Sequence, residues 1–343
     1  MKSKQIISLL LVFCLLLSFC ACSAQNEVKS DRPCITDAAG RSVPLPESPE
    51  AATAASVYAV AAPFYVALGM TDRVKAVNVK SSFWKLADKG LAASDTVGRG
   101  VVDLEKLAAL SPTYLVHRSN DAETVEAVEK LGIDVICITV ENMDDIYSTL
   151  RLLGQCFGAE KRAEETIAWL DKKLALIDSV VETIPAEERK TALLMGGEPG
   201  RIAGNDMLQS WMIEQAGGIC VADTGLNHNW VNVGVEKVFS YDPQVLFCTG
   251  STARNYSAES LLSDPAWSAL RCVRDGEVYV IPTEKDSWDM PGISCVLGIF
   301  YMMRKMYPDY FSASDFEDEV DDYYRFMFGR CFDQELELDW SEY

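Results

Sequence analysis

Short apolar segments alternate with amphipathic segments along most of the chain. In the first half, strands are predicted at 53–58, 74–79, 113–116 and 135–140. In the second half, strands are predicted at 191–195, 245–248 and 278–281, and helices at 207–215, 293–306 and 315–328. This alternation is typical of an α/β fold in which helices flank parallel strands. We therefore expect two α/β lobes, each with a central, mostly parallel sheet.

One amphipathic segment between the two halves is longer than a crossover helix needs to be. Residues 160–184 place apolar side chains at alternating spacings of four and three, which makes one continuous stripe on a helix. At a rise of about 1.5 Å per residue the helix would be roughly 36 Å long. It ends at Pro185. We interpret it as a rigid strut that joins the lobes; a buried core helix is the alternative.

A smaller signal marks the start of a helix in the first half. Asn120 is followed three positions later by Glu123, which resembles a capping box. The Asn120 side chain could accept a hydrogen bond from the amide of Glu123, so we expect Asn120 to cap this helix.

The first residues predict the compartment. Two lysines precede an almost unbroken apolar run at 6–19, which is too short for a comfortable membrane span and is typical of a signal peptide. The run leads into Cys20, Ala21 and Cys22, a pattern that resembles a bacterial lipobox, and Cys22 is the better acylation candidate because it follows a small residue. We expect an exported lipoprotein, anchored to the outer face of the cytoplasmic membrane or periplasmic. A cleaved soluble form and an uncleaved anchor are the alternatives.

Length and charge narrow the class further. The chain has 343 residues and a formal net charge of −20, which makes nucleic acid a poor partner. A mature part of about 320 residues is large for one hydrophobic core and suits two. The expected organisation is a signal peptide with lipobox at 1–22, a tether at 23–34, an N-terminal lobe at 35–158, a linking helix at 159–185, and a C-terminal lobe with an acidic C-terminal helix at 186–343.

Motifs for metal binding and catalysis are missing from the sequence. The 11 cysteines include no C-x-x-C pair, which argues against a zinc ribbon or an iron–sulfur site. Cys137 and Cys248 lie inside apolar runs and are predicted to be buried. There is no G-x-S-x-G, H-E-x-x-H or P-loop. We expect no catalytic residue and no cofactor; a lipid-anchored enzyme or chelate-processing protein is the alternative of another class.

The two halves contain the same local unit. Residues 102–115 align without gaps against 233–246. In each copy a glutamate stands in the first turn of a short predicted helix, and a proline then marks the turn into an apolar strand. Each lobe is therefore expected to contain the same helix–turn–strand element.

With these residues in view, the chain resembles the class III periplasmic binding proteins, the ABC-importer components that carry cobalamin, haem, ferric siderophores or, in some members, molybdate and tungstate. The resemblance runs from about residue 35 to 332. Its marks are TDAAGR at 36–41 followed by Val43 and Pro44, LEKL at 104–107, AGG at 216–218, EKV at 236–238, DPAW at 264–267, GEVY at 276–279, WDMP at 288–291 and YP at 307–308.

The resemblance implies a mechanism as well as a fold. It implies two α/β lobes joined by one long helix, a ligand in the cleft between them, and little closing movement. It also implies one glutamate per lobe that docks on arginines of a permease served by a cytoplasmic ATPase; Glu105 and Glu236 match these positions. The alternative is that both glutamates are only favourable charges at helix N-termini. The protein is expected to act as a monomer.

Loops that follow the strands predict the ligand-binding residues, because parallel sheets bind ligands at the carboxyl ends of their strands. These loops bring cations and aromatic rings together, which suits a large anionic or amphipathic chelate. The predicted ligand-binding residues are Tyr58, Phe83, Trp84, Arg99, His117, Arg118, Arg201, Asn205, His228, Trp230, Tyr256, Lys285 and Trp288.

The two histidines, His117 and His228, fall in predicted cleft loops of different lobes. They could supply axial nitrogens to haem or to a corrin cobalt, but hydrogen bonding or no role is the interpretation we prefer, so no metal is expected to be bound directly. A ferric siderophore is the first expectation for the ligand, followed by a corrinoid, haem, and molybdate or another small oxyanion.

Overall fold

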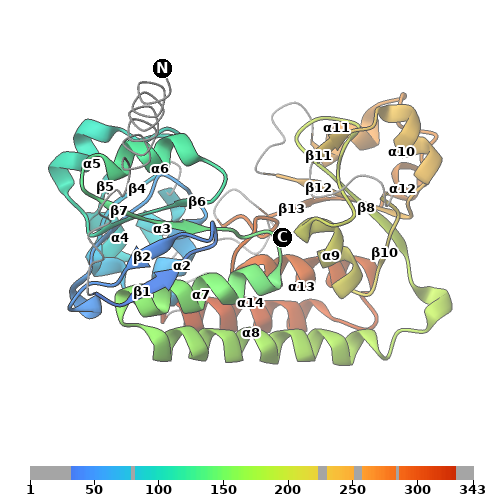
Figure 1. The fold of residues 1–343 in the computed structure, drawn as a ribbon. Coiled ribbons are helices and arrows are strands. Elements are labelled where there is room, and N and C mark those ends of the chain that lie inside the picture. The colour runs from blue at the N-terminus through green and yellow to red at the C-terminus, as the bar shows by residue number, and fades with distance from the viewer. Residues whose placement is uncertain (1–31, 79–81, 223–229, 251–256, 283–285, 330–343) are drawn as a thin grey trace, which may run out of the picture. The chain divides into compact units, whose positions relative to one another are not determined.

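The computed structural model describes residues 32–78, 82–222, 230–250, 257–282 and 286–329. From Cys34 onward the chain forms one compact unit, in which two sheets are flanked by helices (Figure 1). The strands are β1 Cys34–Thr36, β2 Ser42–Pro44, β3 Ala54–Ala55, β4 Val74–Val77, β5 Asp95–Thr96, β6 Tyr114–Arg118, β7 Asp134–Ile138, β8 Thr191–Met195, β9 Arg201–Ala203, β10 Ile219–Cys220, β11 Trp230–Asn232, β12 Val245–Thr249 and β13 Val278–Ile281.

The α-helices are α2 Ala61–Ala67, α3 Ser82–Ala87, α4 Lys89–Ala93, α5 Leu104–Leu110, α6 Ala122–Glu129, α7 Met143–Phe157, α8 Glu160–Val181, α9 Leu208–Gln215, α10 Val235–Tyr241, α11 Ala258–Ser263, α12 Arg271–Asp275, α13 Cys295–Met306 and α14 Ala313–Phe328. Three 3₁₀ helices complete the elements: η1 Pro49–Ala51, η2 Thr71–Arg73 and η3 Ala186–Glu188. The predicted α/β fold with two lobes is confirmed.

The first lobe is built on a fully parallel sheet with the strand order β5-β4-β3-β6-β7. Residues 114–117 of β6 and 135–138 of β7 are all buried, as expected when helices cover both faces of a parallel sheet. The predicted strand at 53–58 is shorter in the structure, because only Ala54 and Ala55 pair with both neighbours and the register shifts between them. The carboxyl ends of all five strands meet at one edge.

The second lobe has a mixed sheet with the strand order β11-β9-β8-β12-β13, and β10 also pairs with β8. The strands β10, β8, β12 and β13 run parallel, and the predicted ranges 191–195 and 278–281 are confirmed. The antiparallel β9 and β11 were not predicted. The chain turns back before β9 with Gly200 at φ 80°, and the amide of Gly196 donates to the carbonyl of Arg201 at 2.6 Å.

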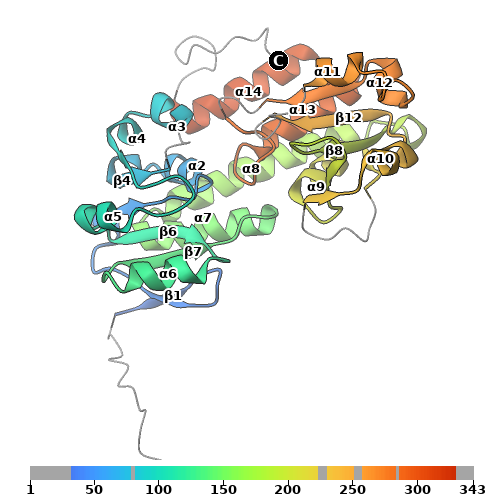
Figure 2. The same cartoon turned by 90° about the horizontal axis from the view of Figure 1, so that it is seen from above.

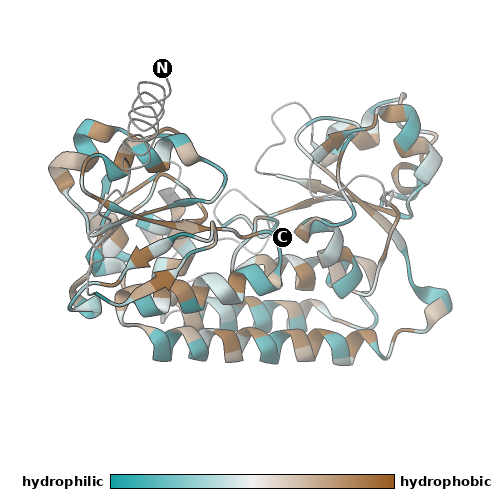
Figure 3. Cartoon of the chain, viewed as in Figure 1, coloured by the Kyte–Doolittle hydropathy of each residue, from teal (hydrophilic) through white to brown (hydrophobic). Residues whose placement is uncertain are grey.

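The long helix α8 contacts both lobes, and its predicted position is confirmed. It has 22 residues and packs against α7 and α2 of the first lobe and against α9 and α13 of the second. Figure 1 shows both sheets on the same side of α8, and Figure 2 shows the arrangement from above. Hydrophobic and hydrophilic residues alternate along α8 in Figure 3, as the predicted apolar stripe requires. The helix stops before residue 185 because 182–184 already form a turn.

The last described helix, α14, lies beside α8 and reaches back to the first lobe. Lys173 of α8 is buried and forms ion pairs with Glu319 and with Asp322 at 2.7 Å. At its far end α14 packs on α2 and on the aromatic rings of α3. Part of the acid of the predicted C-terminal helix therefore has a structural role. The domain boundary at residue 186 remains a prediction.

Three further predictions can be compared with the structure. Asp121, and not Asn120, caps α6, because its side chain accepts from the amide of Thr124; the predicted cap was wrong by one residue. Cys137 and Cys248 are buried, as predicted, and the described cysteines form no disulfide with one another. Of the described helices, none combines the length and the apolar run that a bilayer span requires. The leader and Cys22 lie outside the described residues.

Candidate functional site

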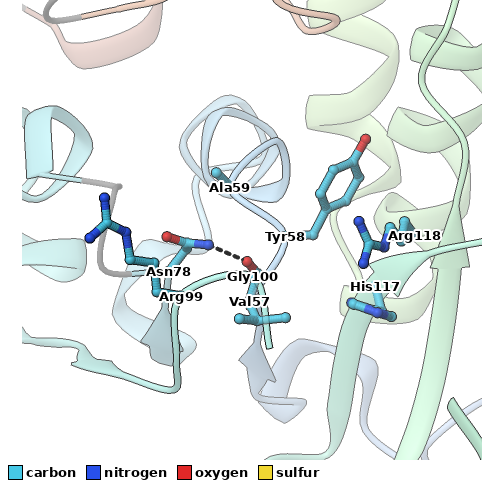
Figure 4. Close-up of a pocket in the computed structure, with 8 residues that line it drawn as sticks. All are labelled: Val57, Tyr58, Ala59, Asn78, Arg99, Gly100, His117 and Arg118. Atoms are coloured by element: carbon cyan, nitrogen blue, oxygen red, sulfur yellow. Dashed lines mark hydrogen bonds between the residues drawn. The ribbon is translucent and has the colours of Figure 1, made fainter. Parts of the chain in front are cut away.

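A cavity of about 410 Å³ lies at the carboxyl edge of the first sheet (Figure 4). Its walls come from the segments that follow β3, β4 and β5 and from the end of β6, which is the location that parallel-sheet geometry predicts. The lining residues are Val57, Tyr58, Ala59, Asn78, Arg99, Gly100, His117 and Arg118. Four of the predicted ligand-binding residues, Tyr58, Arg99, His117 and Arg118, are therefore brought together.

Two buried polar side chains hold the floor of this cavity. The Ser56 hydroxyl donates to the carbonyl of Val116 at 2.8 Å and accepts from the amide of Tyr58 at 3.0 Å, which ties β3 to β6. The Asn78 amide donates to the carbonyl of Val57, which ties the end of β4 to the same segment. Neither residue was among the predicted site residues. Their only sequence signal is a polar residue immediately after an apolar strand.

The cation Arg99 is presented by a narrow loop at 98–102. Gly98 and Gly100 have φ of 130° and 82°, an isolated antiparallel bridge joins Gly98 to Val102, and a Cβ at Gly98 would collide with the carbonyl oxygen of Val101. Only glycine permits this approach. Arg99 is exposed, and within the described part of the chain its guanidinium has no hydrogen bond or ion pair. It is therefore available to an anion.

On the other side of the cavity, His117 and Arg118 share one carboxylate. The Nε2 atom of His117 lies 3.0 Å from Oδ2 of Asp121, and Arg118 donates to the same oxygen at 3.1 Å. Burial lowers the pKa of His117, although Asp121 opposes the shift, and the hydrogen bond from His117 is the first cause that holds the pKa of Asp121 well below its usual range. His117 is thus neutral near pH 7 and carries its proton on Nε2. Its Nδ1 atom is buried without a partner among the described residues.

Tyr58 contributes a phenol to the upper wall (Figure 4). Burial raises its pKa to about 12, the carboxylate of Glu141 adds to the shift, and Arg118 opposes it. The phenol therefore stays protonated and can donate a hydrogen bond to a ligand oxygen. The cavity as a whole offers donors and positive charge: Arg99, the half-exposed Arg118, and the Tyr58 hydroxyl.

Three predicted ligand rings lie in the hydrophobic core instead. Phe83 and Trp84 are 7% and 8% exposed and pack on Tyr324 and Phe328 of α14. Trp288 is 1% exposed and packs edge-on against Phe316, with ring centroids 6.0 Å apart. These rings have almost no surface to offer a ligand in this structure, so we do not include them in the site.

The remaining predicted residues belong to the second lobe. Arg201 is exposed, and its side chain makes no hydrogen bond or ion pair with another described residue; Asn205 is partly buried, and Trp230 is partly buried next to Gly196. None of the three lines the first-lobe cavity. The predictions for His228, Tyr256 and Lys285 lie outside the described residues.

The second lobe also contains a buried polar cluster that the sequence only partly indicated. The Gln209 amide donates to the carbonyl of Asp289 at 2.7 Å, and burial raises the pKa of the Asp289 carboxyl to about 6. Within the described ranges, Oδ1 of Asp289, Oε1 of Gln209 and Oδ1 of Asn205 are buried acceptors without a hydrogen bond. Asp289 ends one predicted cleft loop, whereas Gln209 lies inside a helix and gave no signal.

The repeated glutamates occupy equivalent places. Glu105 and Glu236 are exposed in the first turns of α5 and α10, which lie on different lobes and on the side away from α8 (Figure 1). Each helix ends at a non-glycine residue in the left-handed conformation, Ser111 at φ 42° and Asp242 at φ 40°. Since a left-handed non-glycine residue is uncommon, the shared cap makes the sequence repeat a structural one.

Protein side chains for direct metal binding do not gather in the described part of the chain. No group of three or more histidine, cysteine, aspartate or glutamate residues there could hold a metal ion. Of the two histidines that could supply axial nitrogens, His117 is described and is 1% exposed.

Comparisons with known proteins agree with this architecture. A family model described as "Periplasmic binding protein" matches residues 55–284. The ABC transporter substrate-binding lipoprotein YvrC of Bacillus subtilis is 24% identical over 254 residues, which cover 71% of this chain and 76% of the relative. The Fe(3+)-citrate-binding protein YfmC of the same organism is 22% identical over 84% of this chain and 91% of its own length. The molybdate-bound structure of MolA from Haemophilus influenzae superposes with a TM-score of 0.74, at 19% identity over 88% of this chain and 99% of that one; this likeness concerns the fold.

Proposed function

This chain belongs to the periplasmic binding protein family, and we propose that it captures an anionic metal chelate, a ferric siderophore in the first place, for an ABC importer. The observation that carries the proposal is the exposed guanidinium of Arg99, which has no partner among the described residues, in a cavity that Arg118 also lines. Guanidinium groups bind carboxylate and catecholate oxygens in a bidentate manner, and these are the oxygens that surround ferric iron in siderophores. In a protein with a net charge of −20, such a cavity is a local exception.

The relatives support the ligand class without choosing one member. YfmC is named for Fe(3+)-citrate and MolA for molybdate, and both ligands are anions built around a metal. The cavity, at about 410 Å³, falls in the usual range for organic ligands and exceeds what a single small oxyanion fills. The volume therefore favours a chelate over molybdate, which becomes the second candidate because a relative is named for it.

Haem and corrinoid ligands are less favoured by the geometry. Axial ligation by His117 requires its free Nδ1 atom to face the metal, but the ring is 1% exposed and Nδ1 is buried. The ring would have to turn out of the core before Nδ1 could reach a metal.

The captured chelate is then delivered to the permease of the importer. Glu105 and Glu236 dock on basic residues of the permease, and the chain acts as a monomer anchored through a lipid on Cys22. The exposed position of both glutamates on one side of the molecule supports this docking (Figure 1). The second lobe is proposed to close the other side of the ligand with Arg201, Asn205 and Trp230 together with His228, Tyr256 and Lys285.

Equilibrium binding tests the ligand assignment. The purified protein would be titrated with ferric citrate, a ferric catecholate siderophore, haem, cobalamin and molybdate, with tryptophan fluorescence as the readout. We expect one ferric chelate to bind with one-to-one stoichiometry and to be recovered chemically unaltered after release. Failure of both ferric chelates while molybdate, haem or cobalamin binds would refute the ligand class, and turnover of a chelate would instead favour an enzyme.

A further inference from the structure

The two docking faces are not equivalent, although their helices repeat. Beside Glu105, the apolar side chains of Val101 and Leu104 are 78% and 37% exposed. The equivalent positions in the second lobe hold the exposed, polar Asn232 and the partly buried Val235, which packs on the core of that lobe. Exposed apolar surface next to the proposed docking charge therefore occurs on one lobe and not at the matching place on the other.

The backbone holds Val101 in this position. Val101 is the outer residue of the loop at 98–102, where the bridge between Gly98 and Val102 closes the loop and the amide of Asp103 donates to the carbonyl of Val97 at 2.9 Å. Val101 therefore points into solvent from a loop whose two strands are held together by hydrogen bonds. Its apolar surface is unfavourable in water, so burial of this side chain by a partner would be favourable.

The residues around Val101 indicate which kind of partner would bury it. Glu105 directly follows Leu104 in the first turn of α5, and Asp103 caps that helix by accepting from the amide of Lys106 at 3.0 Å. Apolar side chains beside exposed carboxylates fit a partner surface that has an apolar hollow with basic residues at its rim. A lipid surface fits less well, because carboxylates are repelled by anionic headgroups.

We propose that Val101 and Leu104 are an apolar anchor for the importer's permease, and that this anchor makes the first lobe the dominant docking lobe. The inference rests on the proposed function, because it takes the permease to be the partner of Glu105. The asymmetry makes the contact at α5 apolar as well as charged, whereas the contact at α10 rests on the charge of Glu236.

The anchor can be tested by binding to the permease–ATPase complex of the source cell, reconstituted in nanodiscs. Val101→Asn is expected to raise the dissociation constant about tenfold, since burial of one valine contributes on the order of one such factor. Leu104→Asn is expected to have a similar effect. The matched change in the second lobe, Asn232→Ser, is expected to alter the dissociation constant less than about twofold. Because Val101 is exposed, an unchanged melting temperature would show that Val101→Asn folds normally.

The outcomes separate the inference from the function on which it rests. If Val101→Asn and Leu104→Asn bind like the wild type while Glu105→Lys with Glu236→Lys does not bind, the apolar anchor is refuted and docking stands. If the wild-type chain itself does not bind the complex, the proposed function fails. If sedimentation instead shows that the wild type self-associates and Val101→Asn abolishes this, the face is an interface between two copies and the permease anchor is wrong.

Discussion

The repeated units that contain α5 and α10 have the same helix and the same left-handed cap but differ in the segments that precede them. Both place a glutamate in the first helical turn, and both stop at a left-handed cap, Ser111 or Asp242. Upstream, in the same register, Arg99 stands on a glycine loop, whereas Trp230 stands on β11 and pairs with Ala203 of β9. The two units therefore share the glutamate that we propose for docking on the permease. They differ at Arg99 and Trp230, where we propose that each lobe contacts the ligand.

The largest expected effect is a loss of chelate uptake when the glutamates that the two units share are replaced. Reversing both charges, Glu105→Lys with Glu236→Lys, is expected to lower chelate uptake by cells at least about 100-fold, because two attractive contacts become repulsive. The affinity for the chelate should not change. The control is Glu123→Lys, which reverses an exposed acid in the first turn of α6. Uptake that survives the double change would contradict the docking assignment.

The next effect tests where the units differ. Arg99→Ala should raise the dissociation constant of the chelate by about 10- to 100-fold, the range expected for a lost charge-assisted hydrogen bond. Trp230→Ala should raise it less, about fivefold, since a partly buried ring loses only stacking. Arg151→Ala removes a surface cation that pairs with Glu164 and serves as the control. Calorimetric titration measures all three, and an unaffected Arg99→Ala would remove this residue from the site.

Buried titratable groups in the two lobes should make stability depend on pH in opposite directions. Burial raises the pKa of Asp289 in the folded protein to about 6, whereas in the unfolded chain it is about 4. Between these two pH values the unfolded chain loses the proton while the folded protein keeps it. The free energy of unfolding therefore falls as pH rises from about 4 to about 6. Asp289→Asn should therefore stabilise the protein by about 2 kcal/mol at pH 8 and leave it unchanged at pH 4. His117 acts in the opposite direction, since its lowered pKa gives stability that is lost as pH falls below about 6.5. Urea unfolding at both pH values measures the difference, and a less stable Asp289→Asn variant at pH 8 would contradict it.

The smallest effect concerns the two left-handed caps. Ser111→Gly should stabilise the protein by about 0.5 kcal/mol, because glycine adopts positive φ without strain. Asp242→Gly should not, because Oδ1 of Asp242 accepts from the amide of Arg271 at 3.1 Å and that bond would be lost. Thermal unfolding compares the pair; equal shifts in both variants would show that the two caps are energetically the same.

Most of the fold could be predicted because burial leaves a regular trace in the sequence. The strands β8 and β13 were predicted at their observed bounds, since continuous apolar runs bounded by polar residues mark buried parallel strands. The long helix was found from its apolar stripe. The antiparallel strands β9 and β11 were missed because each has only three residues, which is too short for periodicity to detect.

The site could be predicted where local rules apply and could not where tertiary contacts decide. Arg99 and Arg118 were predicted at the carboxyl ends of parallel strands, and both line the cavity there. Phe83 and Trp84 also follow a strand, but α14 packs over them, and no local pattern indicates a contact with a helix so far along the chain. Asn78 was missed because its role, holding the carbonyl of Val57, exists only in the folded chain.

The position of the metal in a crystal of the complex tests the central claim most directly. Crystals grown with the ferric chelate that binds would give an anomalous scattering peak at the iron absorption edge. The account predicts one peak per molecule at the cavity of the first lobe, with chelate oxygens hydrogen-bonded to Arg99. A peak away from that cavity, or a chelate that leaves Arg99 without a contact, would contradict it.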